Sequence, residues 1–350
     1  MLQKGMIILG IETSCDETAA SLVNAEKGIL SNIVSSQFKE HKPFGGVVPE
    51  IAARAHLDHI DLIVEKAFEE ADLTLDDIDG VAVAGGPGLI GGVIVGVMMA
   101  KGLAMAKGVP FVPVNHLEAH ALTARLTNDI PFPYLLLLVS GGHCQFLIVE
   151  DVGRYTYLGG TLDDALGECL DKTARLLGHS YPGGPVIEKL ALEGNSAAFT
   201  FPKPLKGQEG CDFSFSGLKT AARKVILETT EKSPTFQQDF CASFQKAIGE
   251  ILRDRSQHAL KMAFEKAPAI STLVVGGGVA ANRYFHDCLT LCAQDYGIAV
   301  VSPPINLCTD NGAMIAWAGI ERLQKNLKGS LSFAPRPRWP LEDLKLERGD

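Results

Sequence analysis

Two histidines stand four residues apart in the segment His116-Leu-Glu-Ala-His120, directly after an apolar run that ends at Asn115. On an α-helix this spacing puts both imidazoles on one face. Paired neutral imidazoles on one helix face are a common site for a transition metal. A helix that carries two histidines for other reasons is the alternative. The spacing therefore indicates a candidate metal site.

The segment differs from the metalloprotease helix H-E-x-x-H, in which the glutamate directly follows the first histidine. Here Glu118 lies two residues from each histidine. At 3.6 residues per turn, that offset turns Glu118 about 200° away from His116. Glu118 is therefore expected to point away from a metal held by the histidines, and protease chemistry is disfavoured.

Two glycine turns have the composition of phosphate-binding loops. Ser140-Gly-Gly-His143 lies between two strand-like runs, and Gly276-Gly-Gly278 lies between a strand and a predicted helix. Glycine lets the backbone approach a ligand closely, and a helix N-terminus favours an anion. Asn282, in the first turn of that helix, could bind a base or a ribose. A plain hairpin and a packing turn are the alternatives.

Several carboxylates could complete a site. Asp310 precedes a helical stretch, and beside the two histidines it would complete a set of two imidazoles and one carboxylate. From the sequence alone, however, a helix N-cap is the favoured interpretation of Asp310. Glu12 and Asp16, in the first polar turn, could face a cleft, and Glu12 is a candidate catalytic residue. Ordinary turn chemistry is the alternative for both.

The composition limits the classes of protein. A chain of 350 residues predicts about two domains, and 46% hydrophobic with 21% charged residues is typical of a globular protein. The formal net charge of −9 argues against coating nucleic acid through a global field. None of the eight cysteines forms a CxxC pair, so they are expected to be reduced thiols.

No segment is predicted to cross a membrane. The most apolar window, 89–105, is interrupted by glycines and by Lys101, which favours a buried helix. The N-terminus does not have the pattern of a signal peptide, because Glu12 and Asp16 follow a very short apolar run. We therefore expect a cytoplasmic protein without a membrane partner.

The elements that must position these residues follow a repeated pattern. Residues 6–23 and 134–149 each read as strand, polar turn, strand, which indicates an internal duplication and two similar α/β halves with a cleft between them. Further strands are predicted at 80–84, 109–114, 272–276 and 298–301, and helices at 52–72, 90–106, 162–177, 236–266, 281–294 and 312–324. Asp163 and Asp164 are expected to open the helix 162–177.

Many motifs, in order, resemble those of one family over nearly the whole chain. They are Gly10-Ile-Glu-Thr-Ser-Cys-Asp-Glu-Thr18, Gly46-Val-Val-Pro-Glu-Ile-Ala-Ala-Arg-Ala-His56, His116-x-Glu-x-His120, Val139-Ser-Gly-Gly-His143, Asp163-Asp-Ala165, Asp171-Lys172, Tyr181-Pro-Gly-Gly-Pro185, Phe213-Ser-Phe-Ser-Gly-Leu-Lys219, Gly276-Gly-Gly-Val-Ala-Ala-Asn282 and Asp310-Asn-Gly312. The chain thereby resembles the TsaD family of tRNA N6-adenosine threonylcarbamoyltransferases, and within it the bacterial branch.

The resemblance implies an α/β fold of the actin, Hsc70 and sugar-kinase type (ASKHA), with two RNase H-like lobes around a nucleotide cleft. The implied N-terminal lobe covers residues 1–132 and is completed by the C-terminal helix 311–330. The C-terminal lobe covers 133–310, and residues 331–350 form a surface tail.

The resemblance also implies the site. One divalent metal ion per chain, with iron (Fe²⁺) favoured and zinc as the alternative, would be held by His116, His120 and Asp310. Threonylcarbamoyl-adenylate would be bound by Leu138, Val139, Ser140, Gly141, Gly142, Asp171, Gly184, Glu188 and Asn282. The implied partners are tRNA and the accessory subunits TsaB and TsaE. The chain departs from the family at Cys144, where a threonine is usual, so a hydroxyl donor is lost.

The implied reaction is transfer of the threonylcarbamoyl group to N6 of adenosine 37 in tRNAs that read codons beginning with A. Two other functions stay open at this point. A kinase of the same fold would use the glycine turns for ATP and Mg²⁺, although Mg²⁺ prefers oxygen ligands to imidazoles. A non-catalytic nucleotide-binding scaffold is the third possibility.

Overall fold

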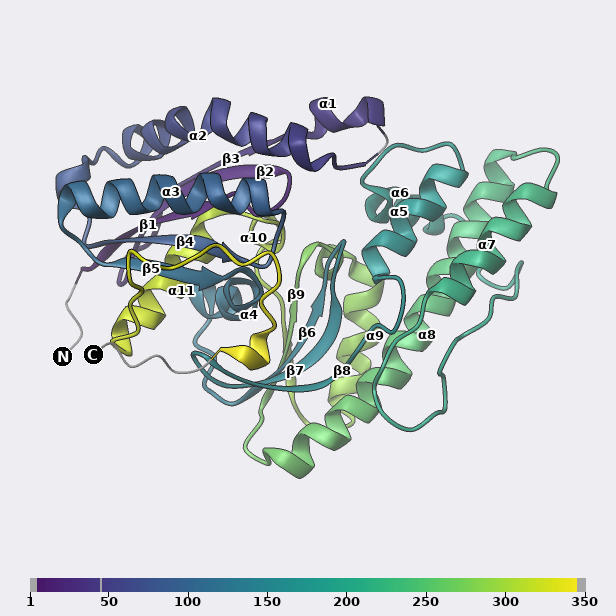
Figure 1. Cartoon of the computed structure of the whole chain (residues 1–350). Helices are drawn as coiled ribbons and strands as arrows, with labels where there is room; N and C mark the ends of the chain where they lie inside the picture. The colour runs from purple at the N-terminus through teal and green to yellow at the C-terminus, as the bar shows by residue number, and fades with distance from the viewer. Residues whose placement is uncertain (1–4, 45, 345–350) are drawn as a thin grey trace. The chain divides into compact units, whose positions relative to one another are not determined.

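Two five-stranded sheets of the same topology organise the chain (Figure 1). In the first sheet the order is β3-β2-β1-β4-β5, and in the second it is β8-β7-β6-β9-β10. In both sheets a central strand pairs antiparallel with the next strand of the chain and parallel with a later one: β1 with β2 and β4, β6 with β7 and β9. This shared order confirms the internal duplication predicted from residues 6–23 and 134–149.

The computed structural model describes residues 5–44 and 46–344, and these form two compact units. Unit 1 comprises the residues up to Asp129, the short segment Asp151–Tyr155 and the chain from Thr309 onward. Unit 2 comprises Ile130–Glu150 and Thr156–Cys308. Of the expected surface tail, 331–350, residues 331–344 fall in unit 1, and residues 345–350 lie outside the described residues.

Unit 1 is a sheet with helices on both faces. Its strands are β1 Ile7–Glu12, β2 Glu17–Asn24, β3 Gly28–Ser36, β4 Gly80–Gly86 and β5 Phe111–Asn115. Its helices are α1 Phe38–His41, α2 Pro49–Ala71, α3 Ile90–Lys107, α4 His116–Thr127 and α11 Gly312–Gln324. Helices α2 and α3 cover one face, while α11 and α4 lie on the other (Figure 1). The apolar side chains of β1, β2 and β4 are buried beneath α2 and α3.

Unit 2 packs five longer helices with its sheet. Its strands are β6 Tyr134–Val139, β7 Cys144–Asp151, β8 Arg154–Gly160, β9 Thr272–Gly276 and β10 Ala299–Val301. Its helices are α5 Leu166–Leu176, α6 Gly183–Ala191, α7 Ser216–Glu228, α8 Pro234–Lys266, α9 Arg283–Gln294 and the short α10 Ile305–Cys308. One apolar cluster joins strands β6, β7 and β9 to helices α5, α7, α8 and α9.

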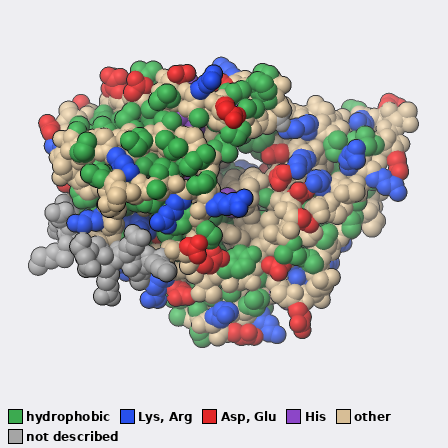
Figure 2. Space-filling model, viewed as in Figure 1, with side chains coloured by type: hydrophobic (Ala, Val, Ile, Leu, Met, Phe, Trp, Pro, Cys, Tyr) green, Lys and Arg blue, Asp and Glu red, His purple; other side chains and the backbone are tan. Residues whose placement is uncertain are grey.

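Helix α3 is the one described helix that is long and apolar enough to cross a membrane by composition, and one such helix is weak evidence for a span. Gly92, Gly96 and Ala100 are buried, and the helix packs against β4 and α2. Its outer face exposes Ile94 and Met98. The buried helix expected from the sequence is therefore buried on one face only, and hydrophobic side chains gather over α2 and α3 in Figure 2.

Two predicted helix starts are wrong. The helix expected from residue 162 begins at Leu166, so Asp163 and Asp164 lie before it rather than in its first turn. The helix expected from residue 281 begins at Arg283 and follows a 3₁₀ turn, Gly278–Ala281. In the second case Asn282 is the N-cap, because its side-chain oxygen accepts a hydrogen bond from the Phe285 N–H.

Candidate functional site

Both histidines and Asp310 come together in unit 1. The Nε2 atoms of His120 and His116 lie 3.0 and 3.6 Å from Oδ1 of Asp310. One ligand atom from each of the three residues lies within 4.8 Å of the others. Ligand atoms held at ~2.1 Å from one metal ion are about 3.0–3.4 Å apart at ordinary coordination angles, so these separations suit a shared ion. The three residues form a candidate metal site.

The start of helix α4 places the two imidazoles. Asn115 caps the helix, because its side-chain oxygen accepts hydrogen bonds from the N–H groups of Leu117 and Glu118. His116 is thereby fixed in the first turn and His120 one turn later. Glu118 points away as expected: its buried carboxylate accepts hydrogen bonds from Gly153 and Tyr155 and pairs with Arg322.

Asp310 is not the helix cap that the sequence favoured. The N-cap of α11 is the next residue, Asn311, whose side-chain oxygen accepts a hydrogen bond from the Met314 N–H. Asp310 itself lies against His120. A polar pair such as Asp310-Asn311 before a helix cannot show from local pattern which member caps it.

Glu12 lies behind His116 as seen from Asp310. Its carboxylate is fully buried and lies 2.9 Å from Nδ1 of His116, while the Ser14 hydroxyl lies 3.2 Å from the same nitrogen. An imidazole whose Nδ1–H is held by a carboxylate presents its Nε2 to a metal, which is the usual support of a histidine ligand. The position of Glu12 is that of a group that orients His116.

Negative charge is concentrated around the three ligands. Burial disfavours a charged His116, but the carboxylates of Asp310 and Glu12 outweigh it and raise the pKa of His116 to about 9. Burial, followed by the charges of Asp310 and Asp16, raises the pKa of Glu17 to about 9. Carboxylates crowded in this way favour a bound cation, so the chemistry of the site fits a metal ion.

The glycine turn between β6 and β7 lies in unit 2. The turn is closed by the Ser140 N–H, which donates to the His143 carbonyl, and by the His143 N–H, which donates to the Ser140 hydroxyl. A Cβ added at Gly141 or Gly142 would meet no atom within 4 Å. By contrast, the side chains of Leu138 and Val139 are buried, so only their backbones are available to a ligand.

The second glycine turn packs directly against the first. Gly277 has φ +89°, and a Cβ there would lie 2.4 Å from the carbonyl oxygen of Val139. On the other side, the Gly167 N–H of α5 donates to the Ser140 carbonyl. Because β6 and β9 are parallel neighbours, the two turns meet at the carboxyl ends of these strands, the edge at which such sheets bind ligands.

The remaining residues expected to bind the substrate surround the same edge. Asp171 on α5 accepts a hydrogen bond at 2.7 Å from the Gly183 N–H, beside Gly184 at the start of α6. Glu188 on α6 accepts one from the Arg283 N–H, next to Asn282. The structure therefore brings these residues together in unit 2, although the Asn282 amide already caps α9 and bonds to Gln245.

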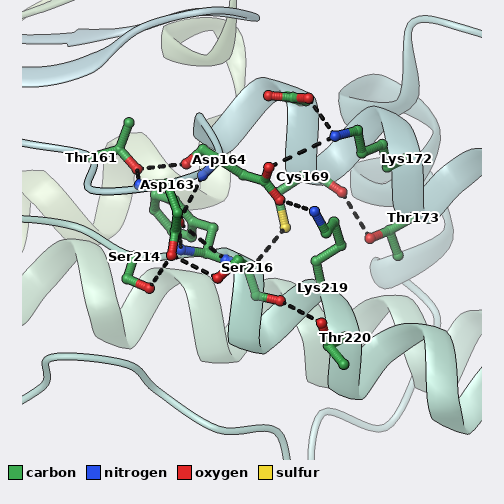
Figure 3. A network of polar contacts seen from close by, with 12 residues as sticks. Thr161, Asp163, Asp164, Cys169, Lys172, Thr173, Ser214, Ser216, Lys219 and Thr220 are labelled. Atoms are coloured by element: carbon green, nitrogen blue, oxygen red, sulfur yellow. Dashed lines mark hydrogen bonds and ion pairs between the residues drawn. The ribbon is translucent and has the colours of Figure 1, made fainter.

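Figure 3 shows a polar network that the sequence pattern did not predict. Asp163 accepts hydrogen bonds from the hydroxyls of Ser214 and Ser216 and from the N–H groups of Phe215 and Ser216, at the start of α7. Although its partial burial acts in the opposite direction, these donors lower the pKa of Asp163 to about 2. Asp163 thus caps α7 rather than the helix that follows it in the chain.

Asp164, the next residue, pairs with Lys219 of α7 and lies 3.7 Å from Lys172 of α5 (Figure 3). The Asp163-Asp164 pair therefore joins α5 to α7 beside the first glycine turn, since the Thr161 N–H donates to the Cys144 carbonyl. In the sequence these residues belong to two separate family motifs, Asp163-Asp-Ala165 and Phe213-Ser-Phe-Ser-Gly-Leu-Lys219, and nothing in either motif indicates that the two meet.

Cys144 does not face the open side of the glycine turn. Its side chain lies in the apolar cluster of unit 2, and burial raises the pKa of the Cys144 thiol well above its usual range. A protonated, enclosed thiol does not contact a phosphate, so the exchange from threonine leaves the backbone of the turn intact.

Comparison with solved structures places the fold in the ASKHA class. The chain matches full-length HypF in its phosphate- and nucleotide-bound form with a TM-score of 0.58 and 13% identity. The match covers 95% of this chain and 48% of HypF, so this chain spans about half the length of that protein. It matches component A of the (R)-2-hydroxyglutaryl-CoA dehydratase of Acidaminococcus fermentans with a TM-score of 0.51 and 15% identity, over 91% and 99% of the two chains.

Sequence comparison defines the family. The family model for tRNA N6-adenosine threonylcarbamoyltransferase, TsaD, matches residues 28–317. The threonylcarbamoyltransferase of Paramagnetospirillum magneticum is 55% identical over 96% of this chain and 97% of its own length. The enzyme of the same name from Brucella anthropi is 56% identical over 97% and 96%. The chain belongs to the TsaD family of tRNA N6-adenosine threonylcarbamoyltransferases.

Proposed function

We propose that this chain transfers the threonylcarbamoyl group of threonylcarbamoyl-adenylate to N6 of adenosine 37 in tRNAs that read codons beginning with A. The products are N6-threonylcarbamoyladenosine and AMP. The observation that carries the proposal is the convergence of His116, His120 and Asp310 in a member of this family.

The reaction needs positioning more than a protein nucleophile. The adenylate is a mixed anhydride, so its carbamoyl carbon is already activated. N6 of the adenosine attacks that carbon and loses a proton, while the bond from the carbon to the phosphate oxygen breaks and AMP leaves. Holding the two reactants together and stabilising the leaving phosphate are the main contributions left to the protein.

The residues of unit 2 hold the adenylate. The backbone at Gly141 and Gly142 has open space beside it, so its N–H groups can approach the phosphate. Asp171, Gly184 and Glu188 frame the same edge of the sheet, next to the start of α9. Asn282 binds through its neighbouring backbone or after its amide leaves Gln245.

The residues of unit 1 hold the metal. His116, His120 and Asp310 are its ligands, and Glu12 orients His116 rather than acting on the substrate. A divalent ion bound there supplies a Lewis acid for carbonyl or phosphate oxygens. Two imidazoles and one carboxylate with open positions suit Fe²⁺, our favoured ion, and zinc is the alternative. This donor set also disfavours the kinase, because Mg²⁺ prefers oxygen ligands.

TsaB and TsaE are proposed accessory partners, and a cytoplasmic location is proposed with them. Leu57 and Leu62 of α2 and Met98 and Met105 of α3 are exposed, and Figure 2 shows hydrophobic side chains gathered over these two helices. Contiguous apolar surface on a helix pair is typical of a protein interface, so we expect TsaB to bind there. Met98→Asp should then abolish co-elution with purified TsaB, whereas loss of binding only after changes in unit 2 would contradict this.

A metal measurement tests the site. His120→Ala and Asp310→Asn should each lose bound iron or zinc in elemental analysis, while adenylate affinity in calorimetry changes little. His59→Ala, a change on the exposed face of α2, is the matched control and should keep its metal. If both ligand variants retain one ion per chain, the ligand set is wrong.

A further inference from the structure

A short loop supports the metal ligand His116 from behind. The loop consists of Thr13–Asp16 and connects β1 to β2. Its residue Ser14 contacts Nδ1 of His116 through the hydroxyl group, and the Ser14 N–H donates to Glu12, the other group on that nitrogen. A displacement of this loop therefore moves the Ser14 hydroxyl away from His116 and removes the N–H that holds the Glu12 carboxylate.

Every residue of the loop is hydrogen-bonded to another element of unit 1. The Thr13 hydroxyl donates to the Gly92 carbonyl at 2.9 Å, and the carbonyls of Ser14 and Asp16 accept hydrogen bonds from the N–H groups of Leu89 and Gln37. The Cys15 carbonyl lies 3.0 Å from Nε2 of His56. Of the three groups that hold the carbonyls of Ser14, Cys15 and Asp16, two are backbone N–H groups and the third is the side chain of His56.

His56 is the last member of a chain of hydrogen bonds with one possible direction. The chain begins at the Val48 N–H, which can only donate, and reaches Nδ1 of His41 at 3.3 Å. Nε2 of His41 then donates to Oε1 of Gln37 at 3.1 Å, and Nε2 of Gln37 donates to Nδ1 of His56 at 3.2 Å. The chain ends at the Cys15 carbonyl, which can only accept.

The two backbone ends therefore fix both imidazoles as neutral rings with the proton on Nε2. All three side chains are buried, and the Thr18 hydroxyl also lies 2.8 Å from Nδ1 of His56. The ring lies against Gly92 of α3, where an added Cβ would be only 3.0 Å from Nε2 of His56, so a larger residue at position 92 would push the ring away.

We propose that His56 is a positioning residue for the metal centre: its Nε2–H holds the Cys15 carbonyl and so keeps Ser14 and Glu12 on His116. The inference rests on the proposed metal site. It also gives a role to the motif Gly46–His56, because this motif contains both Val48, where the hydrogen-bond chain begins, and His56, its last side chain. Partners that support metal ligands change metal affinity by 10- to 100-fold when removed.

Two similar substitutions separate positioning from packing. In His56→Gln the amide nitrogen falls near the place of Nε2 and can still donate to Cys15. In His56→Asn the shorter side chain falls near Nδ1, so it keeps the partners Thr18 and Gln37 but cannot reach Cys15. Both variants replace a buried ring by a smaller amide, and His59→Asn on the exposed side of α2 is the control.

The readouts are the Co²⁺ dissociation constant and the visible d–d spectrum of bound Co²⁺, with thermal unfolding of the metal-free proteins alongside. We expect His56→Asn to bind Co²⁺ about ten-fold more weakly with an altered spectrum, and His56→Gln and His59→Asn to behave like the original chain. Equal affinity and equal spectra for the Asn and Gln variants would overturn the inference. If the original chain itself binds no Co²⁺, the proposed metal centre fails as well.

A measurement on the unchanged protein covers the case in which His56→Asn does not fold. Nitrogen-15 NMR of the imidazoles reports which ring nitrogen carries the proton. The inference requires a protonated Nε2 and a bare Nδ1 in His56. A proton on Nδ1 with none on Nε2 removes the donor to Cys15 and overturns it.

Discussion

Replacing Gly141 and Gly277 should have opposite consequences, although both lie in glycine turns at the same edge of unit 2. Gly141 has open space at its Cβ position and no positive φ, so Gly141→Val should change the free energy of unfolding by no more than about 0.5 kcal/mol. The new side chain would occupy the space proposed for the adenylate phosphate. We expect adenylate affinity to fall at least about ten-fold, or ~1.4 kcal/mol.

Gly277→Ala should instead destabilise the fold. Its φ of +89° and ψ of 165° are costly for any other residue, by about 1–3 kcal/mol, and the added Cβ would lie 2.4 Å from the Val139 carbonyl oxygen. Together these effects should cost about 3 kcal/mol. At roughly 2–4 °C per kcal/mol, the unfolding temperature should fall by about 6–12 °C.

Thermal unfolding and calorimetry with a non-hydrolysable adenylate analogue check both changes. Gly102→Ala, inside helix α3 of unit 1, where a Cβ also meets no neighbour, is the control. It should leave the analogue affinity unchanged and should raise the unfolding temperature slightly, because alanine is favoured over glycine in a helix by about 0.5–1 kcal/mol. The reasoning is refuted if Gly141→Val lowers the unfolding temperature as much as Gly277→Ala, or if it binds the analogue with unchanged affinity.

Three further variants test the charged groups of unit 2. The folded-state pKa of Asp163, about 2, lies below its ordinary value, so its contribution to stability is present at neutral pH and is lost as the pH falls from about 4 to 2. Because the carboxylate is largely exposed, Asp163→Asn should lower the free energy of unfolding by only about 1 kcal/mol near pH 7. Urea titrations should show that this difference from the original chain vanishes near pH 2, and a difference that does not depend on pH would contradict this cause. Arg223 and Lys224, on the exposed side of α7, are candidate contacts for tRNA phosphates. Arg223→Ala with Lys224→Ala should therefore weaken tRNA binding and flatten its salt dependence by about one unit per lost phosphate contact. Lys203→Ala with Lys206→Ala should weaken tRNA binding less, since both ammonium groups pair with Glu250. If a filter-binding titration shows the larger loss of affinity for this second variant, the RNA binds another surface than α7.

The sequence predicted the parts of the fold that depend on local pattern. The duplicated strand-turn-strand segments are two contiguous apolar runs around a polar turn, and α8 at Pro234–Lys266 has a long amphipathic pattern, so both were recognisable. The ASKHA class followed from motif order and is confirmed by the solved structures. The spacing of His116 and His120 correctly predicted that both rings share one face of a helix.

Features that depend on distant parts of the chain could not be predicted. Asp163 caps a helix that begins 53 residues later, and nothing near Asp163 indicates that partner. The contact of Asp310 with His120 spans 190 residues, so the local rule for helix caps favoured the wrong interpretation. His56 was visible in the sequence only as the end of a family motif within the predicted helix 52–72, because its partners Cys15 and Gln37 come from other segments.

Nucleoside mass spectrometry tests the central claim most directly. The purified chain with its metal, TsaB and TsaE would be incubated with threonylcarbamoyl-adenylate and an unmodified tRNA that reads a codon beginning with A. We predict N6-threonylcarbamoyladenosine at position 37 together with an equal amount of AMP, and neither product with His120→Ala. Unmodified tRNA under conditions in which the adenylate is bound, or phosphate transfer from ATP in its place, would contradict the account.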